Sequence, residues 1–252
     1  MESTPSQGYV EVSRSRGLSI CEWVRGRGIS VRQVLDIGCG FGITLATVKR
    51  ELGCHGVGVE PAPGPARYAV EKLGLDVRVG MFAPQIVGGA KFDLIILMHV
   101  LEHTQEPVEF LSQVRLVTTT NGISVVEVPN MRKRDDCRGL ATHFFSFPHL
   151  YYFTLTTLQS ILGLSGWEVI SAKDSHNLRV VAKPSAVSAQ YIRDDPRKIR
   201  LYLHWYQMKS GLVGSMRCVQ NAIRIAVRKI MVAVLGERVT RKLLDIARNI
   251  LK

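Results

Sequence analysis

Short apolar runs alternate with amphipathic segments between residues 18 and 184. The apolar runs that we expect to form strands are 34–37, 57–60, 76–79, 92–98 and 123–128, with a closing antiparallel hairpin at 167–172 and 177–183. The segments with helical spacing are 18–28, 43–52, 66–73, 107–118 and 154–164. Regular alternation of strands and helices predicts a three-layer α/β/α sandwich with a mostly parallel seven-stranded sheet.

The most informative stretch is 34–42, which reads Val-Leu-Asp-Ile-Gly-Cys-Gly-Phe-Gly. A buried strand runs here into three glycines at alternate positions and then into a helix, an arrangement that offers bare backbone N–H groups to a ligand. Glycine permits positive φ and keeps a Cβ away from the ligand. The second strand ends in Glu60, where such folds place an acceptor for a ribose diol.

Two kinds of nucleotide site compete for this stretch. A dinucleotide fingerprint requires Gly-x-Gly-x-x-Gly, whereas the chain has Gly-x-Gly-x-Gly, with Asp36 two positions before the first glycine. An acid so close to the loop suits a ligand with a positive end and no pyrophosphate. The stretch resembles the first motif of the class I S-adenosylmethionine-dependent methyltransferases, (Asp/Glu)-x-Gly-x-Gly-x-Gly. That resemblance covers about residues 30–184 and is closest to the small-molecule branch with ubiquinone-type and sugar enzymes.

The resemblance implies a Rossmann-like fold that binds S-adenosylmethionine. One departure concerns the segment after the third strand, where the family commonly has an acidic or amide side chain that reads adenine. This chain has Gly-Met-Phe-Ala at 80–83, so adenine recognition is expected from Met81 or Phe82 and from backbone atoms, unless both are core residues. The implied cofactor-binding residues are Asp36, Gly38, Cys39, Gly40, Gly42, Glu60, Met81, Phe82 and Met98.

The family's second recognisable segment is present at 92–103, an apolar strand followed by His-Val-Leu-Glu-His. In the family, the end of this strand lines the methionine end of the cofactor, and the Val-Leu-Glu-His that follows faces the substrate side. A hydroxyl acceptor needs a base whose pKa lies near the working pH, and histidine supplies one. Two interpretations stay open for each histidine. It packs in the core or anchors a loop, or it takes part in catalysis as a base or in a metal-assisted acceptor site. The candidate catalytic residues are Glu102, His103, His143 and His149.

Other chemistries fit the sequence less well. The segment 99–103 matches the inverted zinc-protease motif His-x-x-Glu-His, which requires a helix, but it follows a run that is typical of a central strand. Enzymes that methylate base amino groups carry Asn/Asp-Pro-Pro-aromatic after the fourth strand, and cytosine C5 enzymes need Pro-Cys; the chain has neither. We therefore predict a small-molecule substrate, since nothing in the sequence supports methylation of a nucleic-acid base.

Length and composition limit the size of the core and the cellular location that we expect. With 252 residues, 46% of them hydrophobic, the chain can bury a full core and add an extension. The N-terminal segment has no secretory pattern, and no apolar run reaches the length of a membrane span. The five cysteines include no Cys-x-x-Cys pair, which indicates reduced, packed thiols. A cytoplasmic location is expected, with attachment to the inner face of a membrane as an addition.

The charge is uneven, since residues 191–252 hold 14 of the 33 basic residues but only 4 of the 21 acidic ones. We predict a methyltransferase domain at 1–187 and a basic amphipathic helical tail at 188–252. Three interpretations of the tail stay open, ranked in this order: packing on the core or in a homodimer, an anionic membrane surface bound through 212–251, and RNA. The alternative function is a non-catalytic methyltransferase-like protein that acts through this tail.

Overall fold

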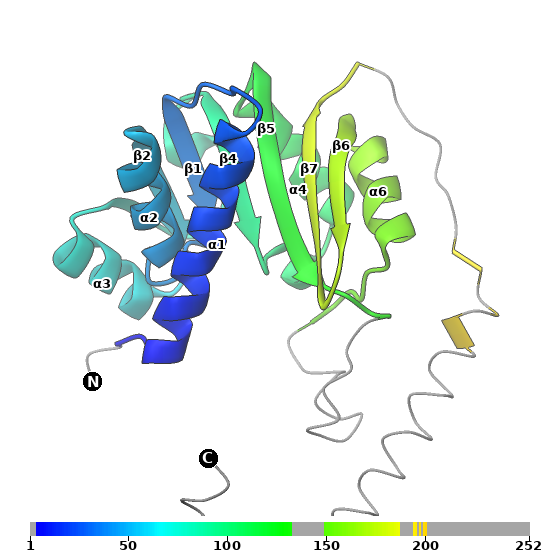
Figure 1. The fold of residues 1–252 in the computed structure, drawn as a ribbon, viewed down its shortest axis with the longest axis horizontal. Helices are drawn as coiled ribbons and strands as arrows, with labels where there is room; N and C mark the ends of the chain where they lie inside the picture. The colour runs from blue at the N-terminus through cyan, green and yellow to red at the C-terminus, as the bar shows by residue number, and fades with distance from the viewer. Residues whose placement is uncertain (1–3, 133–148, 187–193, 196, 198, 201–252) are drawn as a thin grey trace, which may run out of the picture. The chain divides into compact units, whose positions relative to one another are not determined.

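The computed structural model describes residues 4–132, 149–186, 194, 195, 197, 199 and 200 (Figure 1). Its strands are β1 (Gln33–Ile37), β2 (His55–Glu60), β3 (Asp76–Val79), β4 (Phe92–Met98), β5 (Thr118–Pro129), β6 (Trp167–Asp174) and β7 (Asn177–Pro184). Its α-helices are α1 (Gln7–Arg25), α2 (Ile43–Leu52), α3 (Pro63–Leu73), α4 (Pro107–Leu116) and α6 (Leu155–Leu164). Two short 3-10 helices, η1 (Pro84–Val87) and η2 (Leu101–His103), complete the described elements.

The strands form one sheet in the order β3-β2-β1-β4-β5-β7-β6. The first five strands pair in parallel, and β7 runs antiparallel to both β5 and β6. The strand order reverses between β1 and β4, and such a switch point opens a crevice beyond the carboxyl ends of the strands. The predicted mostly parallel seven-stranded sheet is confirmed.

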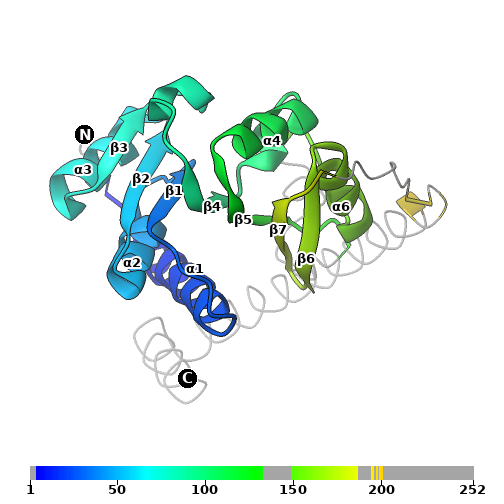
Figure 2. The same cartoon turned by 90° about the horizontal axis from the view of Figure 1, so that it is seen from above.

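Helices cover both faces of the sheet, which gives three layers (Figure 2). One core cluster joins α1, α2 and α3 to one face, through side chains such as Ile20, Val48 and Ala69. The other joins α4 and α6 to the opposite face, through side chains such as Leu111 and Leu158. The central strand β4 contributes to both clusters, as expected for an apolar strand that is covered on both faces.

Helix α1 is longer than the sequence pattern predicts. It begins after Ser6, whose side chain accepts a hydrogen bond from the Tyr9 N–H, and not at Leu18. The additional turns carry mostly exposed residues, so they show no apolar stripe. Gly17 is the point of close packing between α1 and α2, because a Cβ there would lie 2.8 Å from Thr47 Cβ on α2. The missing side chain lets the two helices approach closely.

The dipeptide Asn-Gly at 121–122, which follows the helical segment 107–118, predicts a turn, but this prediction is wrong because β5 runs through both residues. The β4–β5 pairing passes from Phe92–Thr118 to Leu94–Ile123, so the extra residues are taken up as an irregularity inside the strand. A Cβ at Gly122 would lie 2.9 Å from the Phe92 carbonyl oxygen. Glycine is needed here for close backbone approach within the sheet and not for a hairpin.

Several predictions fall outside the described residues, namely His143 and nearly all of the basic tail. The described residues up to Asp195 belong to one compact unit. Its cysteines, Cys21, Cys39 and Cys54, are free and buried, in line with the expected packed thiols. None of the helices in the described part of the chain combines the length and apolar character that a membrane span requires.

Candidate active site

The glycine loop between β1 and α2 adopts the backbone that its sequence predicts. Gly38, Gly40 and Gly42 have φ values of 71°, 54° and 74°, which favour glycine over residues with a Cβ. Added Cβ atoms at these positions would lie 2.5 Å from Val100 Cγ2, 2.6 Å from Tyr9 Oη and 2.5 Å from Leu75 Cδ1, respectively. The space above the glycines is therefore used partly by the protein's own side chains, which the sequence pattern did not show.

Two buried carboxylates flank the glycine loop. Asp36 is 2% exposed, and its Oδ2 has no hydrogen-bond partner among the described residues. Glu60 accepts the Gly40 N–H at Oε2 and the Ala62 N–H at Oε1, both at 2.8 Å. Because a carboxylate has about four lone-pair sites, Glu60 retains capacity for ligand hydroxyls. The unpartnered Asp36 oxygen and the capacity of Glu60 fit a ligand with a cationic group and a ribose.

A cleft of about 850 Å³ opens at the carboxyl ends of β1, β2 and β4, and we call it the main cleft. Gly38 and Glu60 line it on one side, and Phe82 and Phe110 line it with rings in edge-to-face contact at 5.7 Å. Phe110, on α4, was not among the predicted site residues. The two rings form an apolar part of the cleft wall, and Phe82 also packs against a core cluster, so its predicted contact with adenine stays a prediction.

The remaining predicted cofactor residues lie in different places. Met81 lines the main cleft with 78% of its surface exposed. Met98 packs against the core cluster on the α1–α3 side. Cys39 is buried, and its Sγ occupies the space above Gly58, where a Cβ would lie 2.7 Å away.

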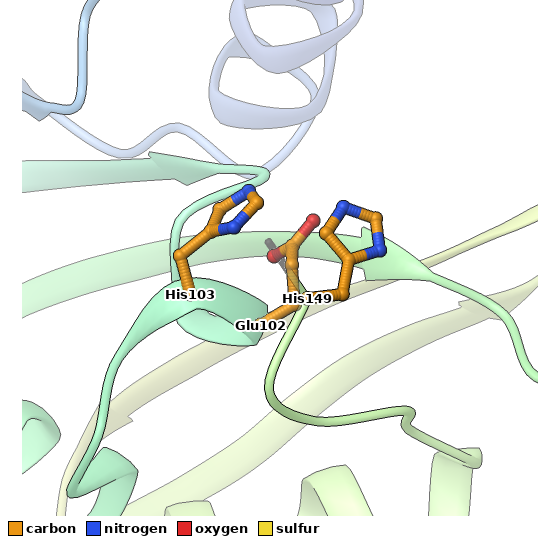
Figure 3. Close-up of side chains that lie close together, drawn as sticks. All are labelled: Glu102, His103 and His149. Atoms are coloured by element: carbon orange, nitrogen blue, oxygen red, sulfur yellow. The ribbon is translucent and has the colours of Figure 1, made fainter. Parts of the chain in front are cut away.

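Three of the four predicted catalytic residues come together at the end of β4 (Figure 3). Potential ligand atoms of Glu102, His103 and His149 all lie within 4.8 Å of one another, and we call these residues the histidine cluster. The Glu102 carbonyl oxygen accepts the Leu150 N–H at 2.8 Å, which anchors the segment that carries His149. Glu102 itself is fully buried, and its Oε2 has no partner among the described residues.

This cluster has the donor set for a divalent cation or for a general base, since imidazole and carboxylate serve both purposes. His103 lines the main cleft. Residues 99–103 follow the end of β4 and include the short helix η2. The two histidines of this segment therefore do not share the α-helix face that the zinc-protease motif requires.

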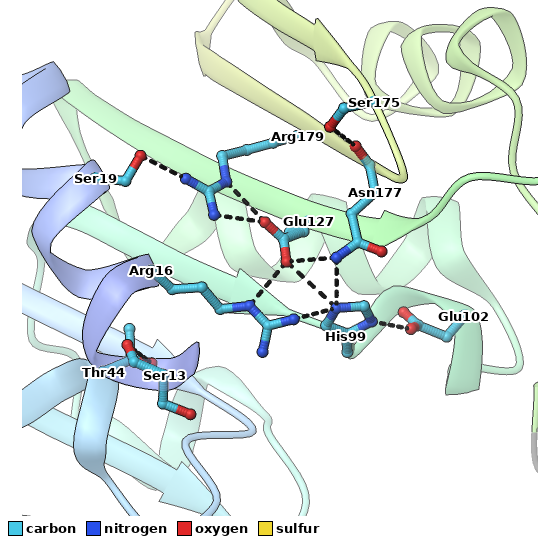
Figure 4. A network of polar contacts seen from close by, with 10 residues as sticks. All are labelled: Ser13, Arg16, Ser19, Thr44, His99, Glu102, Glu127, Ser175, Asn177 and Arg179. Carbon is cyan, nitrogen blue, oxygen red and sulfur yellow. Dashed lines mark hydrogen bonds and ion pairs between the residues drawn. The ribbon is translucent and has the colours of Figure 1, made fainter. Parts of the chain in front are cut away.

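His99 is a second site residue, besides Phe110, that sequence reasoning missed. It has φ 57°, in the left-handed region, and its ring lies at the centre of a network of polar contacts (Figure 4). Nδ1 lies 3.1 Å from Glu102 Oε1, and Nε2 lies 2.7 Å from Arg16 Nη2 and 3.3 Å from Glu127 Oε1. Because a guanidinium only donates, Nε2 accepts from Arg16 when the ring proton is on Nδ1, whereas a proton on Nε2 is donated to Glu127.

The charges in this network shift two pKa values. Burial acts to lower the pKa of His99, but the carboxylates of Glu102 and Glu127 outweigh it and raise that pKa. Burial acts to raise the pKa of Glu127, but the His99 hydrogen bond and the cations Arg179 and Arg16 lower it to about 2. Glu127 is therefore an anion at neutral pH and holds the surrounding donors in place.

The pKa of Asp36 leads to a stability prediction. Burial and, next, the nearby Glu60 raise this pKa to about 8. An unfolded aspartate titrates near 3.9, so between about pH 4 and pH 8 the native state holds a proton that the unfolded state has released. We expect the free energy of unfolding of the ligand-free protein to fall as pH rises through this range, by up to about 1.4 kcal/mol per pH unit.

Urea denaturation at pH 5, 6.5 and 8 measures this effect against Asp36→Asn, which removes the titration and should flatten the decline. Asp76→Asn, at an exposed strand start, is the matched control and should keep the wild-type slope. An Asp36→Asn variant whose stability declines as steeply as that of the wild type would contradict the prediction.

The fold and the glycine loop define a Rossmann-like methyltransferase domain, and comparisons with known proteins agree. A family profile described as a methyltransferase domain matches residues 19–172. This chain therefore belongs to that family.

Curated relatives match a shorter part of the chain. The ubiquinone biosynthesis O-methyltransferase of Azorhizobium caulinodans is 33% identical over 103 residues, which are 39% of this chain and 40% of that protein. The enzyme of the same name from a Ruegeria species is 29% identical over 103 residues, 39% of this chain and 41% of that protein. The matched region thus spans about two fifths of these relatives.

Solved structures share the fold. A SAM-dependent methyltransferase from Archaeoglobus fulgidus aligns with a TM-score of 0.54 and 19% identity, over 69% of this chain and 94% of that one. Magnesium protoporphyrin IX methyltransferase from Synechocystis, with bound SAH, aligns with a TM-score of 0.56 and 16% identity, over 73% of this chain and 90% of that one. The predicted family, fold and S-adenosylmethionine cofactor class are confirmed.

Proposed function

We propose that this chain transfers a methyl group from S-adenosylmethionine to a hydroxyl of a small molecule, such as a sugar or a lipid-linked acceptor. The observation that carries the proposal is the juxtaposition of two sites at the switch point of the sheet. The glycine loop, with the unpartnered Asp36 oxygen beside it, lies at the end of β1, and the histidine cluster lies at the end of the neighbouring β4.

The cofactor supplies an activated methyl group on a sulfonium, with a neutral thioether as the leaving group. Alignment and deprotonation of the acceptor are then the tasks of the protein. Asp36 would hold the cationic end of the cofactor, Glu60 would accept the ribose hydroxyls, and Phe82 with Phe110 would hold the adenine.

His103 would take the acceptor's proton as the new C–O bond forms and the S–C bond breaks. Alternatively, the histidine cluster would hold a divalent cation that lowers the pKa of the acceptor hydroxyl. Both versions place the acceptor oxygen at the rim of the main cleft, which His103 lines.

Calorimetric titration of the full chain with S-adenosylmethionine and, separately, with NAD tests the proposal. We expect micromolar binding of S-adenosylmethionine and none of NAD. Binding of NAD alone would overturn the proposal. Binding of neither compound would overturn it in favour of the non-catalytic alternative.

The tail carries a second, separate proposal, supported by its basic amphipathic sequence at 212–251. We infer that it packs on the core or in a homodimer, with binding to an anionic membrane surface as the competing role. Flotation with anionic vesicles, comparing the full chain with a chain that ends at Pro184, separates these roles. Equal flotation of the two proteins would remove the membrane role.

A further inference from the structure

A second pocket, of about 500 Å³, lies between α1, β5 and the β6–β7 hairpin. Three cationic side chains line it, each from a different element: Arg16 from α1, Lys173 from β6 and Arg179 from β7. The carboxylate of Glu127, on β5, is part of the same wall and is 3% exposed. None of the residues predicted to form a site from the sequence lies in this pocket.

The pocket carries more positive than negative charge. Glu127 pairs with Arg16 Nε at 2.9 Å and with Arg179 Nη2 at 2.6 Å, so one carboxylate faces two guanidinium groups. Its oxygens also accept the Asn177 amide at 3.1 Å, which uses up its lone pairs. Glu11, the other acidic residue of the wall, is exposed on α1, as Lys173 is on β6. One cation therefore remains without a matching anion.

Hydrogen bonds fix the orientations of the two guanidinium groups (Figure 4). Arg179 donates from Nε to Glu127 at 2.8 Å and from Nη1 to Ser19 at 2.9 Å, which fixes its plane. Arg16 is fixed through Nε and Nη2, while its Nη1 has no hydrogen-bond partner in the described part of the chain. A guanidinium that is already oriented loses little entropy when it binds a carboxylate or a phosphate.

His99 connects this pocket to the main cleft. It lines the cleft, and its Nε2 contacts Arg16, which lines the second pocket. A molecule anchored in the second pocket would thus approach the main cleft past His99, at the end of β4 where the histidine cluster also lies.

We infer that the second pocket binds the methyl acceptor through an anionic group, either a carboxylate or a phosphate, with Arg16 as its principal donor. The inference rests on the proposed function, because it places the acceptor beside the S-adenosylmethionine site. It narrows the substrate class to hydroxyl compounds that carry such a group. Lys173 contributes by long-range attraction and Arg179 by orienting Glu127.

The test uses isotope-labelled full chain saturated with S-adenosylhomocysteine. Its amide resonances are followed while sodium phosphate, sodium benzoate or neutral benzamide is added at constant ionic strength. Saturable shifts are expected with phosphate, with benzoate or with both, and which of them saturates identifies the anionic group. Benzamide, which matches benzoate in shape without its charge, should give none.

Variants assign the binding to the pocket. Arg16→Gln should weaken anion binding at least 10-fold, and Lys173→Gln, at an exposed position, about threefold. The matched control is Lys183→Gln, an exposed lysine on β7 that pairs with Glu168 at 3.2 Å, and it should bind like the wild type.

Two results would overturn the inference: no saturable binding of either anion, or equal binding by Arg16→Gln, Lys173→Gln and the control. Binding of S-adenosylhomocysteine is measured in the same samples. If it persists while anion binding is absent, only this inference fails. If it is absent from the wild type, the proposed function fails.

Discussion

Replacing Gly38 by alanine is expected to weaken S-adenosylmethionine binding roughly 100-fold, which corresponds to about 2.7 kcal/mol. Gly38 lines the main cleft at φ 71°, and the new methyl group would lie 2.5 Å from Val100 Cγ2. Val100 lines the same cleft, so either its side chain or the glycine loop must move into the space that the cofactor needs. Titration calorimetry measures the change.

The matched control is Gly53→Ala. Gly53 ends α2 at φ 63°, and nothing lies within 4 Å of an added Cβ. Both variants take on the strain of a left-handed alanine, about 1–2 kcal/mol of folding stability. Only Gly38→Ala should lose affinity, and similar affinities in the two variants would show that the loop does not contact the cofactor.

Removing His103 or His149 is expected to slow methyl transfer by roughly 100- to 10,000-fold, the range typical of a lost general acid or base. The affinity for S-adenosylmethionine should stay unchanged, because neither residue belongs to the glycine loop. Single-turnover rates with an acceptor that the wild type methylates measure this effect in His103→Ala and His149→Ala. The exposed His55, at the start of β2, provides the control variant His55→Ala.

Chelation separates the two roles of the histidine cluster. If the cluster holds a divalent cation, chelation slows the wild type and added Mg²⁺ or Mn²⁺ restores the rate. If His103 is a base, chelation has no effect, and the rate of His103→Ala rises with pH as hydroxide replaces the imidazole. Wild-type rates in both histidine variants would eliminate both roles.

The parts of the site that depend on local sequence were predictable. A strand, a glycine loop and a helix that follow one another in the chain fold together, so the positions of Asp36, Gly38 and Glu60 followed from the pattern alone. The histidine cluster required one longer step, in which the segment at 149–153 returns to the end of β4. The segment reads His-Leu-Tyr-Tyr-Phe and resembles one that the related methyltransferases often show after the fifth strand, which supplied that step, and the structure places Glu102 and His149 side by side.

The His99 network could not be predicted in this way. Its members come from α1, β5, β7 and the segment after β4, and Arg16 and Glu127 are 111 residues apart in the sequence. Each residue looks ordinary in its own segment, and only the sheet order brings them together. Gly17 is similar: in the sequence it weakens a helix, whereas in the fold it permits close contact with Thr47.

The hydrogen bond between Ser19 and Arg179 spans 160 residues of sequence, and this separation bears on how the protein is made. On the ribosome, α1 is synthesised first and can pack against α2 long before β7 exists. Arg179 leaves the ribosome only after all other strands, so the wall that it shares with Arg16 and Glu127 is completed last. A nascent chain can therefore hold its glycine loop while it still lacks the second pocket, and it gains that pocket only when the final hairpin adds to the sheet.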